Sequence, residues 1–108
     1  MIFEVVTLFP EIIESYCNVS IMKRARDNGI FSLNTINPRN YTLDKHKKVD
    51  DTPYGGGAGM VLAPQPYVDA YDSILKSSNS ITVMLSPQGK PLSEDLVKYL
   101  ADFEQIIM

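Results

Sequence analysis

Four apolar runs of strand length alternate along the chain with segments of helical pattern, and this alternation limits the folds open to it. The runs are Ile2 to Leu8, Ile30 to Ile36, Ile81 to Leu85 and Gln105 to Met108. Parallel strands need a crossover connection that is usually a helix, so strands separated by helices favour a parallel sheet. We therefore predict an α/β fold with a mostly parallel sheet and flanking helices.

The segments between these runs predict four helices. They are a helix opened by Pro10, a helix from about Ser20 to Asn28, a helix from Pro64 to about Lys76 and a helix from Ser93 to about Ala101. Ser20 and Ser93 are candidate N-caps, because a serine hydroxyl accepts hydrogen bonds from the first turn. Gly29 suits a helix end. The last apolar run has no turn after it, so we expect residues 1–108 to be the N-terminal part of a longer protein.

The chain has one cysteine and one histidine, which limits the disulfides and metal sites that it can form. Cys17 alone excludes an internal disulfide, which suits a reducing compartment, and we expect it to be a small buried apolar residue. One histidine and one cysteine do not make a conventional zinc site, so no metal is expected. The first residues lack a basic leader, and Pro10 interrupts their apolar run. We expect a cytoplasmic protein.

The net charge of −3 hides an uneven distribution along the chain. From Lys23 to Lys48 the bases exceed the acids by five, and the rest of the chain carries a net charge of −8. A basic stretch of this kind can meet the phosphates of a nucleic acid. A solvated charged face without a partner is the alternative interpretation.

A long polar segment from Tyr41 to Met60 contains four glycines in five positions and predicts a functional loop. The four are Gly55, Gly56, Gly57 and Gly59. Glycine permits positive φ and close approach of a ligand to the main chain. The spacing fits neither a P-loop nor the dinucleotide fingerprint, because Met60 or Leu62 stands where each pattern needs its later glycine. A structurally neutral loop is the alternative.

Charged residues beside these glycines favour an RNA-binding role for the loop. Phosphates can be contacted by Lys45, His46, Lys47 and Lys48. The N–H edge of guanine can donate to Asp50 and Asp51. A turn-capping role for the two aspartates is equally open. His46 has no partner that would make it catalytic.

A second candidate loop follows the third apolar run. It comprises Met84, Leu85, Ser86, Pro87, Gln88 and Gly89. Ligands of open α/β sheets bind beyond the carboxyl ends of the strands, and this loop has polar groups beside apolar ones that could read an adenine edge. A plain tight turn is the alternative.

Several segments in order resemble the N-terminal half of bacterial tRNA (guanine-N(1)-)-methyltransferases of the SPOUT class. They are Thr7 to Glu11, Asn37 to Thr42, Asp44 to His46, Val49 to Met60 and Leu85 to Gly89. The similarity covers essentially all 108 residues, and the segment from Val49 to Met60 is highly specific.

The resemblance implies an activity and a set of site residues. That family transfers a methyl group from S-adenosyl-L-methionine to the guanine just 3′ of the anticodon, and its members are homodimers with a trefoil knot. By resemblance, Met84 to Gly89 belong to the methyl-donor pocket. The tRNA side would comprise Arg39, Lys45, Lys47, Lys48, Asp50, Tyr54, Gly55, Gly56, Gly57 and Gly59. We expect the tip of the glycine loop to lie beside the donor loop.

Two departures from the family and one missing part qualify these expectations. Asn40 stands where the family commonly has Asp, and Lys47-Lys48 replaces a common Arg-Thr pair, so phosphate contacts would be less directional. The resemblance implies that residues 1–108 lack the rest of the knot, the carboxylate that acts as the general base and the tRNA-binding C-terminal domain, all of which would follow in the C-terminal part. We therefore expect no catalytic residue here and an inactive fragment. A non-catalytic RNA-binding α/β domain is the alternative function.

Overall fold

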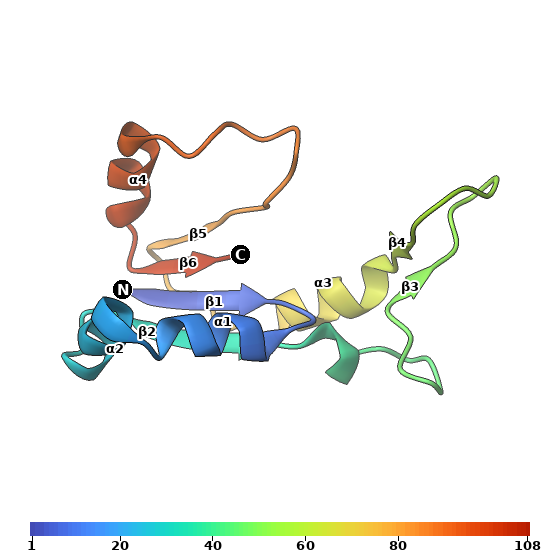
Figure 1. The fold of residues 1–108 in the computed structure, drawn as a ribbon, viewed down its shortest axis with the longest axis horizontal. Coiled ribbons are helices and arrows are strands. Elements are labelled where there is room, and N and C mark those ends of the chain that lie inside the picture. The colour runs from blue at the N-terminus through green and yellow to red at the C-terminus, as the bar shows by residue number, and fades with distance from the viewer.

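The computed structural model describes all 108 residues and contains a four-stranded sheet in the order β2-β1-β6-β5, in which every neighbouring pair is parallel. The strands are β1 (Ile2–Val6), β2 (Ser32–Ile36), β5 (Ser80–Thr82) and β6 (Gln105–Ile107). The predicted α/β fold with a parallel sheet and flanking helices is confirmed (Figure 1).

Four α-helices and one 3-10 helix accompany this sheet. They are α1 (Pro10–Cys17), α2 (Ser20–Asp27), α3 (Pro64–Asp72), α4 (Glu94–Ala101) and η1 (Pro38–Asn40). Nothing among them is long and apolar enough to cross a bilayer. The remaining two strands, β3 (Asp50–Asp51) and β4 (Val61–Leu62), pair antiparallel in a separate ribbon. In Figure 1 this ribbon projects well beyond the sheet.

The central strand β6 forms the most buried part of the sheet. Ile106 is 4% exposed and Ile107 is 1% exposed. Neighbouring side chains on a strand point to opposite faces, and Ile106 shares a hollow with residues of α4 whereas Ile107 shares one with residues of α3. The two helices therefore cover opposite faces of the sheet at β6. Cys17 is buried, as predicted.

Three of the residues predicted to mark helix ends are confirmed and one is not. Pro10 is the first residue of α1, and Gly29 ends α2 with φ +69°. The Ser93 hydroxyl accepts a hydrogen bond of 3.2 Å from the Leu96 N–H at the start of α4. The N-cap predicted at Ser20 is wrong, because Val19 holds that position and makes no side-chain cap. Ser20 itself has φ +50°, which an N-cap residue does not adopt.

Several elements are shorter than the sequence predicts, and the strands predicted over residues 2–8 and 30–36 span Ile2–Val6 and Ser32–Ile36. The strand predicted over residues 81–85 ends at Thr82, and the N–H of Val83 makes one more bond to the sheet before the chain leaves it. The helix predicted to reach Lys76 ends at Asp72. There the Ser73 hydroxyl donates to the Ala70 carbonyl, and the Lys76 ammonium donates to that of Tyr71, so side chains satisfy the last turn.

Candidate functional site

The glycine segment forms the tip of the ribbon made by β3 and β4. Asp50 pairs with Leu62 and Asp51 with Val61, so the ribbon is tied only at its base. Four glycines of the tip have positive φ: Gly55 +81°, Gly56 +79°, Gly57 +120° and Gly59 +89°. An added Cβ would meet nothing within 4 Å at any of them. The main chain of the tip is therefore open to an approaching flat ligand, and the conformation requires glycine.

The base of the ribbon is packed against η1 and α3. Val49 is fully buried, and its carbonyl accepts a hydrogen bond of 2.8 Å from the Ala63 N–H, just before α3 begins. The Tyr67 hydroxyl is buried there without a hydrogen-bond partner. Burial raises the pKa of Tyr67, as does the nearby Asp50 carboxylate, while Arg39 lowers it. Arg39, Asp50 and Tyr67 thus share one electrostatic environment although they come from three elements.

The predicted phosphate contacts cluster at this same base. Lys45, Lys47 and Lys48 are exposed on the loop that leads from η1 into β3, and none has an ion-pair partner. Arg39 is also exposed and donates from Nη1 to the Lys47 carbonyl at 3.2 Å. Tyr54 at the tip is fully exposed. Four cations, Asp50 and the glycine tip therefore belong to one continuous feature.

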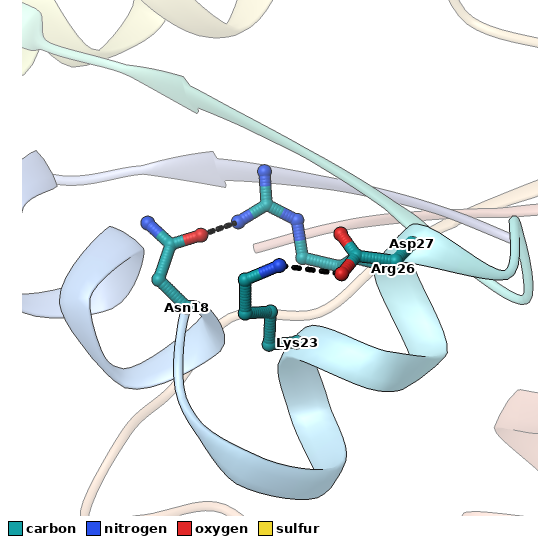
Figure 2. A network of polar contacts seen from close by, with 4 residues as sticks. All are labelled: Asn18, Lys23, Arg26 and Asp27. Atoms are coloured by element: carbon teal, nitrogen blue, oxygen red, sulfur yellow. Dashed lines mark hydrogen bonds and ion pairs between the residues drawn. The ribbon is translucent and has the colours of Figure 1, made fainter.

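The rest of the basic stretch lies elsewhere. Figure 2 shows the Lys23 ammonium paired with the Asp27 carboxylate and the Arg26 guanidinium bonded to the Asn18 side chain. These four residues belong to α2 and the turn that precedes it, away from the projecting ribbon. The basic stretch of the sequence is therefore divided between two parts of the fold, and local pairs occupy much of the α2 part.

The second candidate loop follows β5 at the carboxyl edge of the sheet. It is a tight turn in which the Gly89 N–H donates to the Ser86 carbonyl at 2.9 Å and the Gln88 N–H donates to the Ser86 hydroxyl at 3.2 Å. A Cβ added to Gly89 would lie 3.0 Å from that carbonyl oxygen. Met84 and Leu85 are 88% and 79% exposed. The turn therefore presents apolar side chains beside a compact main chain.

Hollows flank this loop. One of about 310 Å³ lies between the turn and α4, and Met84, Leu85, Ser86 and Gly89 line it. Another of about 460 Å³ lies on the α3 side, where Met84 and Leu85 face Tyr67 and Tyr71. Pro87 and Gln88 line neither hollow. Four of the six predicted donor-site residues therefore border space that a ligand can enter.

The two candidate loops do not meet within one copy of the chain. Figure 1 shows the tip of the ribbon well separated from the loop between β5 and α4. The expectation that a purine at the tip would touch a donor at the turn is wrong for a single copy. Tyr67 borders both regions, since it lines the larger hollow and its pKa is raised by burial and by the Asp50 carboxylate.

Some residues of these features have no signal in the sequence. In the sequence, Tyr67 fits the apolar positions of an amphipathic helix. Only the structure shows that its hydroxyl is buried. Leu96 and Leu100 of α4 line the smaller hollow, which a strand-end loop alone does not predict. Asp44 lies among lysines, where its side-chain bonds to the main chain have no periodic pattern to reveal them.

Comparisons with a family model and with known proteins agree on one family. Residues 1–108 match the family described as tRNA (Guanine-1)-methyltransferase TrmD. A protein of Caldicellulosiruptor saccharolyticus named tRNA (guanine-N(1)-)-methyltransferase is 48% identical over 108 residues, which is 100% of this chain and 44% of that protein. One of the same name from Clostridium acetobutylicum is 49% identical over 105 residues, covering 97% of this chain and 43% of that protein.

A solved structure supports the same relationship. The crystal structure of tRNA (m1G37) methyltransferase from Aquifex aeolicus superposes with a TM-score of 0.79 at 36% identity, covering 99% of this chain and 49% of that one. The chain thus spans less than half the length of these relatives. Because the match extends over every residue of the chain, the chain belongs to the tRNA (guanine-1)-methyltransferase TrmD family.

Proposed function

We propose that the full-length protein transfers a methyl group from S-adenosyl-L-methionine to N1 of the guanine immediately 3′ of the anticodon in tRNA. The observation that carries the proposal is the family match over residues 1–108. The exposed cations and the open glycine main chain of the ribbon support it, since single-stranded RNA bases are recognised on their exposed edges.

The residues after β5 fit a methyl donor of this type. Met84 and Leu85 offer apolar surface for an adenine ring, and the tight main chain from Ser86 to Gly89 offers polar groups for its edge. S-adenosyl-L-methionine supplies a methyl group already activated by the positive sulfur. We assign Met84, Leu85, Ser86, Pro87, Gln88 and Gly89 to this pocket.

The ribbon's task is to orient the acceptor. The guanine N1 lone pair attacks the methyl carbon, the carbon–sulfur bond breaks to give a thioether, and the N1 proton passes to a general base. Alignment of the two reactants provides most of the acceleration in such a transfer. Asp50 and the main chain of Gly55, Gly56, Gly57 and Gly59 would hold the base, with Arg39, Lys45, Lys47, Lys48 and Tyr54 towards the anticodon arm. The general base is expected outside residues 1–108.

A site shared between two copies would resolve the separation of the ribbon from the turn, and we infer that the active protein is a homodimer. Complementation tests this directly. A variant with a damaged tip, Gly57→Val, is mixed with one damaged at the turn, Gly89→Val, under conditions that exchange subunits. If each site joins one copy's ribbon to the other copy's turn, the mixed dimer has one intact site and regains activity. No recovery in proven mixed dimers would reject the shared site.

The activity itself is tested with full-length protein, tritiated S-adenosyl-L-methionine and tRNA transcripts that carry guanine or adenine after the anticodon. We expect label only in the guanine transcript, and nuclease mapping should place it on that nucleotide. Salt-sensitive tRNA binding without any transfer would favour a non-catalytic RNA-binding domain instead.

A further inference from the structure

We infer that Asp44 is a positioning residue for tRNA binding, whose carboxylate shapes the loop that displays Lys45 and Lys47 to the phosphates. The inference rests on the proposed function, because it concerns the same tRNA. Asp44 is itself an anion and does not bind a phosphate. Its role would be to hold the main chain of the lysines that do.

The Asp44 carboxylate holds the loop from inside. Its Oδ2 accepts hydrogen bonds from the main-chain N–H groups of His46 at 2.7 Å and Lys48 at 3.1 Å. The Asp44 carbonyl accepts a third bond, of 3.0 Å, from the Lys47 N–H. Three successive N–H groups therefore bond to one residue, which fixes the main chain from His46 to Lys48.

Three further hydrogen bonds hold the two ends of this loop together. The Thr42 hydroxyl donates to the Lys48 carbonyl at 2.7 Å and accepts from the Asp44 N–H at 3.2 Å. Arg39 donates to the Lys47 carbonyl. The loop is thus fixed on both sides of the lysines, although it is exposed to solvent along its length.

The Asp44 hydrogen bonds hold Lys47 in an unfavourable backbone conformation. It has φ +54°, a left-handed conformation that a residue with a Cβ rarely adopts. The two N–H groups bonded by the carboxylate belong to its neighbours on either side, His46 and Lys48. Without Asp44, only the Arg39 and Thr42 bonds would hold this conformation against its cost, and we expect the Lys47 side chain to leave its present direction.

The charge of Asp44 opposes binding while its geometry favours it. Hydrogen bonds from the N–H groups of Lys48 and His46 hold the pKa of Asp44 below its ordinary value, so it is ionised at neutral pH. An anion beside phosphates repels them, so removing the charge alone would strengthen tRNA binding. Removing the acceptor would weaken it. Two substitutions at this position therefore have opposite expected effects.

The test uses full-length protein and compares Asp44→Ala with Asp44→Asn. Alanine removes charge and acceptor, and we expect tRNA to bind about 10-fold more weakly, with a log K against log salt slope smaller by about 1 because one phosphate contact is lost. Asparagine keeps an acceptor oxygen, and we expect binding equal to wild type or tighter. S-adenosyl-L-methionine affinity should be unchanged in both.

The matched control is Asp72→Ala, which removes an exposed carboxylate that takes no hydrogen bond and lies outside this loop. It should leave the salt slope unchanged. If Asp44→Ala unfolds the protein, Thr42→Val removes the bonds at the loop neck instead and should weaken tRNA binding in the same way. In a Lys45→Ala/Lys47→Ala background, Asp44→Ala should cause no further loss.

Tight binding by Asp44→Ala, or an equal loss in Asp44→Ala and Asp44→Asn, would overturn the positioning role. Failure of the proposed function gives a different result, since the wild-type protein would then not methylate tRNA at all.

Discussion

The side-chain amide of Gln105 donates from Nε2 to the main-chain carbonyl of Leu75 at 3.0 Å, thirty residues earlier in the chain. Its Oε1 accepts a second hydrogen bond of 2.7 Å from the Ser77 N–H. Gln105 is only 2% exposed and lies on β6, so the central strand holds the connection between α3 and β5 through one buried side chain. A buried amide whose two ends are both bonded is stabilising because neither main-chain group is left unpaired.

Replacement of that amide by an apolar side chain of similar length should destabilise the fold. Gln105→Met leaves the Leu75 carbonyl and the Ser77 N–H without partners, and we expect a loss of about 2–4 kcal/mol in the free energy of unfolding. Urea denaturation followed by circular dichroism measures it. Gln88→Met, on an exposed turn, is the control, and an equal loss in both variants would contradict the assignment.

Two tyrosines on α3 should respond in opposite directions to loss of the hydroxyl. The Tyr71 hydroxyl is 2.9 Å from Oγ1 of Thr82, whereas the Tyr67 hydroxyl is buried and unpaired. Tyr71→Phe should cost about 1 kcal/mol, and Tyr67→Phe should be neutral or stabilising by up to about 1 kcal/mol. Thermal unfolding of the two variants checks the difference. A clear loss of stability in Tyr67→Phe would indicate a partner for that hydroxyl.

The same tyrosine predicts a response to alkaline pH. Burial raises the pKa of Tyr67 in the folded state, so the unfolded chain loses this proton first as the pH rises. The contribution of this group to the free energy of unfolding is fully present below the tyrosine pKa of the unfolded chain, about 10. It falls as the pH rises from that value to the folded-state pKa of Tyr67. Tyr67→Phe should therefore reduce the alkaline loss of stability. Unfolding curves between neutral pH and pH of about 11 measure it, and parallel curves for variant and wild type would count against it.

The tip of the ribbon should tolerate a side chain at Ala58 but not at Gly57. Gly57 has φ +120°, where a Cβ is strained even though the space around it is open. Under the proposed function, Gly57→Ala should lower kcat/KM for tRNA by about 100-fold through misplacement of the base. Ala58→Ser, at the neighbouring position, should lower it little. Equal effects would mean that the tip conformation is not used.

The turn after β5 should be sensitive at Gly89 for a steric reason. A Cβ there comes within 3.0 Å of the Ser86 carbonyl oxygen, so the turn must open slightly to accept it. We expect Gly89→Ala to weaken S-adenosyl-L-methionine binding by about 10-fold, equivalent to 1.4 kcal/mol, with tRNA affinity unchanged. Calorimetry with the full-length protein measures this. Unaltered donor binding would remove the turn from the pocket.

Local signals in the sequence predict most of the fold. The apolar runs at Ile2 and at Gln105 are strands as expected, and Gly29 and Ser93 mark helix ends through their own backbone and side-chain chemistry. The error at β5 arises because an apolar run shows only that residues avoid water. Where such a strand ends depends on its partner, and β6 pairs with Ser80, Ile81 and Thr82 and makes only one further bond, to the Val83 N–H.

The site is less predictable because it depends on contacts between distant residues. Four glycines in a polar segment predict an open main chain, and the positive φ values of the tip confirm that part. Nothing local to Gly57 or Ser86 encodes how far apart the two loops lie in space. The same is true within a few residues of Asp44. Nothing in the local sequence shows that its carboxylate accepts bonds from the His46 and Lys48 N–H groups.

The position of β6 has a consequence for synthesis on the ribosome. β1 pairs with β6 on one side, so during synthesis β1 lacks this neighbour until Gln105 to Ile107 have followed it. During that interval the edge of β1 exposes unpaired main-chain groups and the apolar side chains Phe3 and Val5. An unpaired strand edge is a template on which another chain can pair, so this edge is open to aggregation until β6 is inserted beside β1.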